Sequence, residues 1–142
     1  MARPKGIRFL YAGIRVRNVD RSVRFYRSLG FRIRVDGRME HGGRFVHLVL
    51  PGSPGRIELN YYPKSNRFYE PFRRGTEFDH FGFYVDDVAR WIRRARRNGA
   101  PIVAPPWVEG KTRIGYVADP DGNWVEFFGP ARPRRSARRA AA

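Results

Sequence analysis

Apolar and polar residues in the first 62 positions follow two periods, one of two residues and one of about 3.6 residues. Residues 8–16 alternate enough to predict a strand. A helix should follow, capped by Asn18 or Asp20 and running to about Leu29, because Gly30 is suited to the position just past a helix. Its apolar stripe consists of Val19, Val23, Tyr26 and Leu29.

Three further strands complete this stretch of chain. Residues 31–35 alternate strictly, which predicts a half-buried strand. Gly42 and Gly43 make a turn into a strand over 45–50, and the turn at 51–55 leads into a strand over 56–62. The pattern therefore predicts a βαβββ module.

The module occurs twice. A constant shift of 69 residues superposes 11–23 on 80–92 and moves Gly30 onto Gly99, and 55–59 resembles 122–127 at a shift of 67 to 68. The second copy predicts a strand over 78–85, a helix over 87–98, and strands over 101–104, 112–118 and 123–128. We therefore expect an α+β protein built from two tandem βαβββ modules.

Domain organisation follows from the repeat. We expect one domain over 1–130, with modules at about 7–62 and 78–129 and a linker at 63–77 that is a candidate lid. Residues 131–142 contain five Arg among Ala, Pro and Ser and no acidic residue. They are expected to form a disordered, Arg-rich tail.

The net charge says less about the binding partner of the protein than its size suggests. The chain has 29 Lys and Arg residues against 13 Asp and Glu, for a net charge of +16, but 26 of the basic residues are Arg spread over every segment. One helix face is rich in Arg: Arg90, Arg93, Arg94 and Arg97. No basic motif interleaves with aromatic residues beyond that face, so we expect a small anionic substrate and no nucleic-acid partner.

Absent features exclude several classes of protein. The chain has no cysteine, which excludes a disulfide scaffold, thiolate metal sites and a cysteine nucleophile. Its apolar runs are too short to span a bilayer, and the basic N-terminus lacks the apolar region of a signal peptide. We therefore expect a cytoplasmic protein that makes no membrane contact.

The repeat pairs positions with chemically useful side chains, namely Tyr11 with His80 and Glu58 with Glu126. Equivalent residues of two pseudo-symmetric modules can converge on the local axis between them. Alternation places Glu58 and Asn60 on the face opposite Ile57 and Leu59. Because a mid-strand carboxylate is costly unless it is paired or metal-bound, the duplicated positions predict a shared metal site. An ion pair with Arg is the alternative for each glutamate.

Three segments of the chain resemble one known family. They are Ile14-Arg15-Val16 with the following helix to Phe31, Asp79-His80-Phe81-Gly82-Phe83, and Asp119-Pro120-Asp121-Gly122-Asn123-Trp124-Val125-Glu126-Phe127. Over about residues 7–129 the chain resembles the vicinal oxygen chelate superfamily, which includes glyoxalase I, extradiol dioxygenases and bleomycin-resistance-type proteins. The resemblance implies a curved mixed sheet around a central cavity and one divalent metal ion. Its ligands would be Tyr11, Glu58, His80 and Glu126.

The resemblance also implies an activity. Two carboxylates and one imidazole suit Ni, Co, Zn, Mn or Fe(II), and such an ion acts as a Lewis acid on a carbonyl. We expect a glyoxalase-like lyase or isomerase of lactoylglutathione-lyase type, with a metal-stabilised enediolate and Glu126 and Glu58 as the catalytic carboxylates. Arg15 matches a position that contacts the glutathione carboxylate in glyoxalase I. Asn60 and Tyr62 are further candidate substrate-binding residues, and the expected assembly is a homodimer.

Tyr11 departs from the family pattern, since relatives usually have His or Gln there. It would bind metal only as a phenolate, whose formation a metal could promote. The alternatives are therefore a metal-free small-molecule-binding protein of resistance type and an extradiol dioxygenase, although the latter uses two His and one carboxylate. His41 and His47 do not fall on ligand positions. We interpret His47 as a histidine on the sheet face, with a role beside the metal ligands as the alternative.

Overall fold

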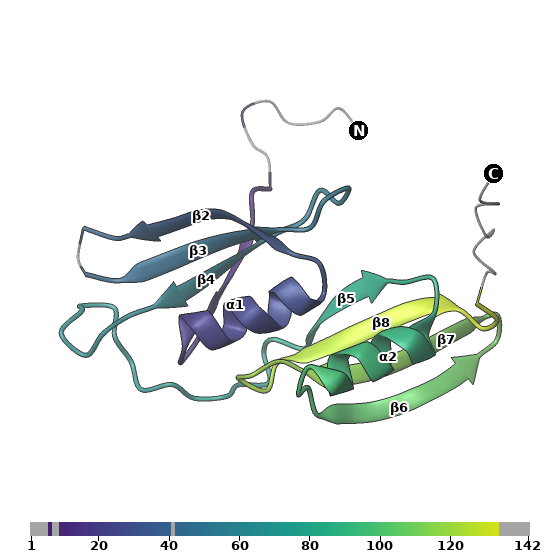
Figure 1. Cartoon of the computed structure of the whole chain (residues 1–142). Coiled ribbons are helices and arrows are strands. Elements are labelled where there is room, and N and C mark those ends of the chain that lie inside the picture. The colour runs from purple at the N-terminus through teal and green to yellow at the C-terminus, as the bar shows by residue number, and fades with distance from the viewer. Residues whose placement is uncertain (1–5, 7–8, 41, 134–142) are drawn as a thin grey trace. The chain divides into compact units, whose positions relative to one another are not determined.

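Each half of the chain folds as one strand, one helix and three more strands, in a computed structural model that describes residues 6, 9–40 and 42–133 (Figure 1). Module 1 consists of β1 (Ala12–Arg15), α1 (Val19–Ser28), β2 (Arg32–Arg38), β3 (Arg44–Val49) and β4 (Arg56–Tyr61). Module 2 consists of β5 (His80–Tyr84), α2 (Val88–Arg97), β6 (Ile102–Glu109), β7 (Thr112–Ala118) and β8 (Trp124–Pro130). The α+β class and the two βαβββ modules are confirmed. The chain divides into compact units between Arg73 and Arg74.

The two modules have the same sheet topology. Module 1 has the strand order β1-β4-β3-β2 and module 2 has the order β5-β8-β7-β6. The first strand of each module pairs in parallel with its last strand, which places Gly13 opposite Glu58 and Gly82 opposite Glu126. The other strand pairs are antiparallel. Each glutamate therefore lies in an inner strand between two hydrogen-bonded neighbours.

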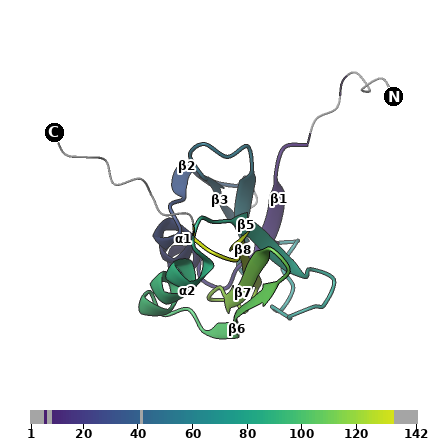
Figure 2. The ribbon, with the colours of Figure 1, turned by 90° about the vertical axis from the view of Figure 1, so that its right-hand side faces the viewer.

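One helix packs on one face of each sheet, as Figure 2 illustrates for α2 and the sheet of module 2. In β4, Ile57 and Leu59 are buried on this face. In β8, Val125 and Phe127 are buried in the same way. The core of each module therefore lies between helix and sheet, and the intervening strand positions face the opposite side.

The helix termini follow the sequence signals. Asn18, not Asp20, caps α1, and its side chain accepts a hydrogen bond from the Arg21 amide at 3.0 Å. Asp87 caps α2 in the same way through the Arg90 amide at 3.1 Å. The glycines after the two helices both have a positive φ, 103° at Gly30 and 89° at Gly99.

The two largest errors in predicted strand length concern β1 and β6. The first strand was expected over 8–16 but β1 covers only Ala12–Arg15. The strand expected over 101–104 extends to Glu109, through Pro105 and Pro106. β6 is an edge strand, and prolines are tolerated at a sheet edge because one side of the strand needs no ladder partner.

The turn before β8 explains the Asp-Pro-Asp-Gly motif. The side chain of Asp119 is buried and accepts hydrogen bonds from the amides of Asp121 at 2.9 Å and Asn123 at 2.8 Å. Gly122 has a φ of 86°, which favours glycine. The turn fixes where β8 begins and therefore where Glu126 lies.

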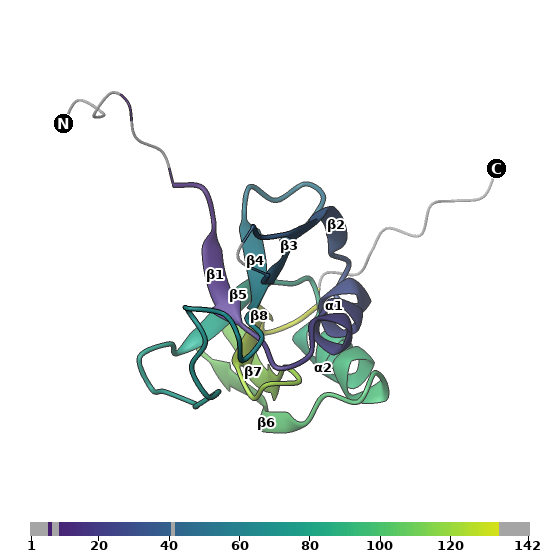
Figure 3. The ribbon, with the colours of Figure 1, turned by 90° about the vertical axis from the view of Figure 1, so that its left-hand side faces the viewer.

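The segment after β4 is irregular, and Figure 3 shows it running beside β1. Its residues 63–73 belong to the first compact unit. Arg15 donates a hydrogen bond from Nη1 to the Phe68 carbonyl at 2.6 Å, and the guanidinium of Arg17 lies 5.0 Å from the centre of the Phe72 ring. Both arginines thus tie this segment to β1 and the turn that comes after it.

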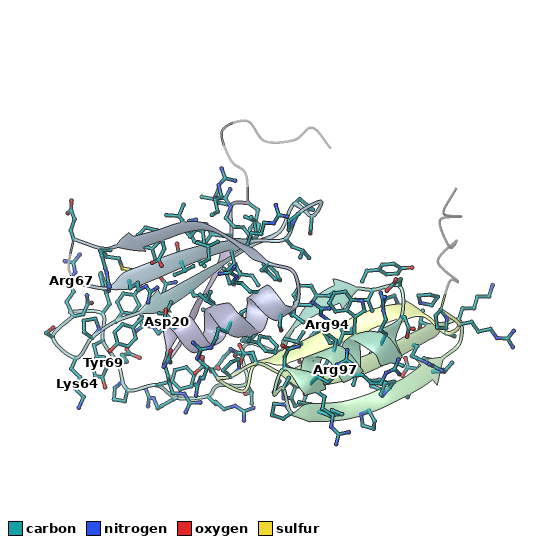
Figure 4. The ribbon with its side chains drawn as sticks, viewed as in Figure 1. Asp20, Lys64, Arg67, Tyr69, Arg94 and Arg97 are labelled. Atoms are coloured by element: carbon teal, nitrogen blue, oxygen red, sulfur yellow. The ribbon has the colours of Figure 1, made fainter. Side chains whose placement is uncertain are left out.

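Some of the exposed basic residues lie on α2. Arg94 and Arg97 project from α2 (Figure 4), and both are exposed. Each helix has ten residues, and within the described residues none has the length and apolarity needed to cross a membrane. Residues 134–142 of the predicted tail, and His41, lie outside the described residues.

Candidate functional site

Glu58 is held by two side chains in module 1. We call this group half-site 1; it consists of Tyr11, His47, Glu58 and Asn60. His47 lies directly opposite Glu58 on β3, and its Nε2 is 2.5 Å from Glu58 Oε2. Asn60 donates a hydrogen bond to Glu58 Oε1 at 2.9 Å. Both carboxylate oxygens therefore have a protein partner.

Tyr11 lies beside this pair. Its ring centre is 4.9 Å from that of His47, tilted by 52°. The negative charge of Glu58, followed by burial, raises the pKa of the Tyr11 phenol above its usual value. In module 1 without a bound cation, Tyr11 is therefore a neutral phenol over the range of physiological pH.

Glu126 has a different neighbourhood in module 2. We call this group half-site 2; it consists of Asp79, His80, Tyr116 and Glu126. Tyr116 lies opposite Glu126 on the adjacent strand β7. Its hydroxyl donates a hydrogen bond to Glu126 Oε2, with the two oxygens 2.5 Å apart. His80 Nε2 lies 3.7 Å from the same oxygen, and His80 Nδ1 contacts Asp79. Among the described residues, no hydrogen bond reaches Glu126 Oε1.

Tyr116 is a permanent hydrogen-bond donor to Glu126. Burial, followed by the interaction with Glu126, raises the pKa of Tyr116 to about 12. The phenol therefore keeps its proton at any physiological pH and stabilises the charged carboxylate. Trp107 stacks on the Tyr116 ring with centres 5.9 Å apart, and Trp124 packs edge-on at 6.0 Å.

Glycines leave space next to both carboxylates. A Cβ atom at Gly82 would lie 3.5 Å from Glu126 Oε1. A Cβ atom at Gly13 would lie 3.5 Å from Glu58 Oε1 and only 3.1 Å from Asn60 Nδ2. The strand next to each glutamate therefore has no side chain that would cover it.

Asn60 has an unusual environment. Its side chain donates to Glu58, but its Oδ1 is the one buried side-chain polar atom of the described residues for which no hydrogen-bond partner is found. Asn60 is 8% exposed. A buried acceptor without a partner normally costs free energy, so this atom is a candidate acceptor for a ligand or a water molecule.

Arg15 and Tyr62 lie together. The Arg15 guanidinium is 4.5 Å from the centre of the Tyr62 ring, and the same side chain bonds the Phe68 carbonyl. Both residues belong to module 1. The structure thus pairs two of the three predicted substrate-binding residues, whereas Asn60 bonds Glu58.

The predicted residues divide between the two modules. Tyr11, Glu58 and Asn60 belong to module 1, and His80 and Glu126 belong to module 2. Within the part of the chain that is described, no three His, Asp or Glu side chains cluster closely enough to form a metal site. In module 1 one imidazole, His47, contacts one carboxylate, Glu58, and in module 2 the His80 imidazole lies between two carboxylates, Asp79 and Glu126.

Of the two side chains that contact the glutamates across strands, sequence reasoning missed Tyr116. For His47, a role beside the metal ligands was the alternative interpretation, and its imidazole contacts Glu58 directly from the sheet face. Tyr116 was given no role at the carboxylate, but it bonds Glu126. The shift of 69 residues moves His47 onto Tyr116, so the repeat contained the signal. Both residues lie opposite the glutamate on the neighbouring strand of their sheets.

Sequence comparison identifies the relatives of this chain. The family model for the Glyoxalase/Bleomycin resistance protein/Dioxygenase superfamily matches residues 8–127. The lactoylglutathione lyase of Haemophilus influenzae is 32% identical over 128 residues, which cover 86% of this chain and 92% of that protein. The lactoylglutathione lyase of Salmonella typhimurium is 30% identical with the same coverage.

Solved structures agree with this assignment. Glyoxalase I of Leishmania major superposes with a TM-score of 0.70 at 26% identity, and the match covers 87% of each chain. A glyoxalase family protein from Bacillus cereus superposes with a TM-score of 0.75 at 19% identity, covering 92% of this chain and 98% of that one, which shows the fold alone. The family resemblance expected from the sequence is confirmed: the chain belongs to the Glyoxalase/Bleomycin resistance protein/Dioxygenase superfamily.

Proposed function

We propose that the chain is a metal-dependent lyase of glyoxalase type that isomerises the hemithioacetal of a 2-oxoaldehyde and a thiol. The observation behind this proposal is the pair of duplicated glutamates, Glu58 and Glu126, each hydrogen-bonded by the residue opposite it on the neighbouring strand. Relatives of similar length that are 30–32% identical are lactoylglutathione lyases. Two carboxylates of different surroundings suit a reaction that moves one proton between neighbouring carbons.

The donor atoms fit a divalent metal ion. Two ligand atoms on one ion lie roughly 3–3.5 Å apart when the bonds are about 2.1 Å long. His80 Nε2 and Glu126 Oε2 are 3.7 Å apart, and the contact of Nδ1 with Asp79 is the arrangement that orients a metal-binding imidazole. We assign His80, Glu126 and Glu58 as ligands, from one chain or from two chains of a homodimer. When bound, the ion supplies a Lewis acid that polarises the substrate carbonyl.

The two glutamates have different roles in this proposal. Glu58 has a partner on each oxygen, so we assign it as a fixed ligand. Glu126 has a partner on Oε2 only, and Gly82 leaves room beside Oε1. We therefore assign Glu126 as the base that takes the proton from the carbon next to the carbonyl and returns it to the neighbouring carbon.

Substrate binding is assigned to Arg15, Tyr62 and Asn60. Arg15 and Tyr62 form a stacked pair next to the segment after β4, and a guanidinium in this position suits a carboxylate of an anionic thiol such as glutathione. Asn60 contributes through its buried Oδ1, which can accept a hydrogen bond from the substrate or from water. A homodimer in the cytoplasm completes the proposal.

The test is turnover of the metal-stripped protein with and without added ions. The protein is purified without a metal-affinity tag, stripped with a chelator and assayed with a methylglyoxal–glutathione hemithioacetal. We expect no thioester product in the stripped form and activity on adding Ni, Co, Zn, Mn or Fe(II). A protein that takes up none of these ions and makes no product would overturn the proposal.

Tyr11 favours a second candidate, a metal-free small-molecule-binding protein of the same superfamily. Glu58 holds the Tyr11 phenol neutral, and a neutral phenol is a poor metal ligand. In that case half-site 1 would present hydrogen-bonding groups to a ligand. Tight binding of a small molecule by protein that binds no metal would favour this candidate over the lyase.

A further inference from the structure

The sheet face of module 2 that is turned away from α2 carries three aromatic rings in contact. Trp107 on β6 stacks on Tyr116 on β7, with ring centres 5.9 Å apart and ring planes 16° apart. Trp124 on β8 packs edge-on against Tyr116, with centres 6.0 Å apart. Trp107 is 36% exposed and Trp124 is 41% exposed, so both tryptophans offer uncovered ring surface. Adjoining exposed apolar side chains mark binding sites more often than single ones do.

Acidic side chains surround these rings, although the chain as a whole is basic. Glu109 accepts a hydrogen bond from Trp107 Nε1 at 3.0 Å, and Glu126 accepts one from the Tyr116 hydroxyl at 2.5 Å. After burial, the negative charges that raise the pKa of Tyr116 are those of three carboxylates: Glu126, Asp79 and Glu109. Because only 13 of the 142 residues are Asp or Glu, three carboxylates at one aromatic cluster depart from the basic character of the chain.

His80 adds an imidazole to this acidic group. Its Nδ1 contacts Asp79, and its Nε2 lies 3.7 Å from Glu126 Oε2. The three carboxylates outnumber it, so the group stays negative whether or not the imidazole is protonated. The Glu126 side chain is 19% exposed, and within the described residues its Oε1 accepts no hydrogen bond. A negative field beside half-exposed aromatic rings favours a positively charged ligand.

We propose that this face of module 2 binds a weakly hydrated organic cation, such as a trimethylammonium group, on the rings of Trp107, Tyr116 and Trp124. An aromatic ring attracts a cation that lies over it within about 6 Å of its centre, and tryptophan does so most strongly. The contacting rings have centres 5.9 and 6.0 Å apart, so one cation can be within this range of two of them. A primary ammonium keeps its water more firmly and suits such a surface less well. The inference concerns module 2 alone and does not depend on the lyase proposal.

The experiment compares a cation with an uncharged molecule of the same shape. Metal-stripped protein is titrated with choline and with the alcohol in which a carbon atom replaces the charged nitrogen, and tryptophan fluorescence is followed. The metal is removed because an ion on Glu126 would add positive charge to the site. We expect choline to bind at least about 5-fold more tightly than the alcohol, which is the size of effect that cation–π attraction gives at partly exposed rings.

Substitutions then assign the site to these rings. We expect Trp107→Leu and Trp124→Leu each to weaken choline binding by at least about 5-fold, because leucine keeps an apolar surface but has no aromatic ring. Trp91→Phe is the matched control, since Trp91 lies on α2 and its Nε1 donates a hydrogen bond to Asp86 at 3.3 Å. This variant should bind choline like the wild type. Circular dichroism checks the folding of all three variants.

A second measurement needs no substitution at the site. In nuclear magnetic resonance spectra, choline should shift the indole N–H signals of Trp107 and Trp124 and leave that of Trp91 in place. The inference is wrong if choline and the alcohol bind equally, if both leucine variants bind choline like the wild type, or if the Trp91 signal alone shifts. None of these results bears on the lyase proposal, which is tested by turnover of the metal-loaded protein.

Discussion

The two modules share a backbone plan but surround their glutamates differently. At four equivalent positions module 1 has Tyr11, His47, Glu58 and Asn60, and module 2 has His80, Tyr116, Glu126 and Phe128. Only the glutamate is the same. Both oxygens of Glu58 have partners, whereas among the described residues only one oxygen of Glu126 is hydrogen-bonded. The difference indicates that duplication preserved the carboxylate and the strand pairing, while the neighbouring side chains diverged to give one fixed and one freer carboxylate.

The largest effects should come from removing the two carboxylates one at a time. We expect Glu126→Gln to reduce turnover by at least about 1,000-fold while the protein still binds metal, because an amide cannot accept the proton. We expect Glu58→Gln to lower metal affinity more strongly than Glu126→Gln, because Glu58 is the fixed ligand. The measurements are single-turnover rates of the metal-loaded protein and calorimetric metal titrations.

Glu40→Gln is the matched control. The side chain of Glu40 is exposed and is not one of the residues of either half-site. This variant should keep the turnover and metal affinity of the wild type. If the two site variants lost metal and turnover to the same extent, the distinction between a fixed ligand and a mobile base would be wrong.

A second difference concerns the helix-facing side of the last strand. Module 1 has the exposed Tyr61 where module 2 has the buried Gly129. A Cβ atom at Gly129 would lie 2.2 Å from the Val85 carbonyl oxygen. Because that oxygen belongs to the backbone, the clash can be relieved only if the backbone itself shifts. We expect Gly129→Ala to lower the free energy of unfolding by roughly 3 kcal/mol, measured by urea denaturation.

Gly115→Ala is the control for this position. There a Cβ atom would meet the end of the Ile92 side chain at 3.1 Å, and that side chain can shift. We expect a loss of at most about 1 kcal/mol. Equal losses for the two variants would mean that the strand can move away from Val85.

The fold could be predicted from the sequence because the signals for it are local. Asn18, Gly30, Asp87 and Gly99 mark the helix ends through hydrogen bonds and φ angles that depend on a few neighbouring residues. The extension of β6 could not be predicted in this way, because Pro105 ends a strand pattern in sequence. Only the position of β6 at the sheet edge makes the proline acceptable.

The candidate site was predictable in its carboxylates but not in their partners. Glu58 and Glu126 stand out because a charge occurs in mid-strand at repeated positions. His47 and Tyr116 contact them across strands, and that contact depends on the register between β3 and β4 and between β7 and β8. The register between two strands is set by the turn that connects them and by the packing of both. The alternation of residues within one strand does not reveal it.

The phenol of Tyr116 should make the stability of the protein depend on pH in the alkaline range. Burial, then the bond to Glu126, raises its pKa to about 12 from the ordinary 10.0. The fold therefore favours the neutral phenol. The stabilisation that the protonated Tyr116 phenol gives to the folded state is complete below pH 10. It is lost as the pH rises from 10 to about 12.

Two measurements check this window. Absorbance titration of the folded protein should contain a late phenolate step near pH 12, and Tyr116→Phe should remove that step. The variant should also lose less stability than the wild type between pH 10 and 12, by at most roughly 2 kcal/mol because the ring is partly exposed. A late step that persists in the variant would belong to another tyrosine.

The smallest effects should come from the ion pairs of the two modules. In module 1, Arg44 on β3 bonds Asp36 on β2 at 2.8 and 3.0 Å and Asp20 on α1 at 3.1 Å. In module 2, Arg90 and Asp86 form a pair at 2.9 Å that connects only the start of α2, and both side chains are more than half exposed. Arg44 and its two partners connect β3, β2 and α1, whereas Asp86 and Arg90 connect only residues close together in the chain. We therefore expect the two groups to differ in their contribution to the free energy of unfolding.

We expect Asp36→Asn to cost about 1 kcal/mol of unfolding free energy and Asp86→Asn about 0.3 kcal/mol, both measured by urea denaturation at neutral pH. The bond to Arg44 lowers the pKa of Asp36, so its contribution is present above pH 3.8 and is lost as the pH falls below that value. For Asp86, burial alone would raise the pKa, but the bonds to Arg90 and Trp91 outweigh it and the pKa is lowered. The difference between the two variants in lost unfolding free energy should therefore disappear at acidic pH. A gap that stayed open at low pH would mean that Asp36 acts through packing and not through its charge.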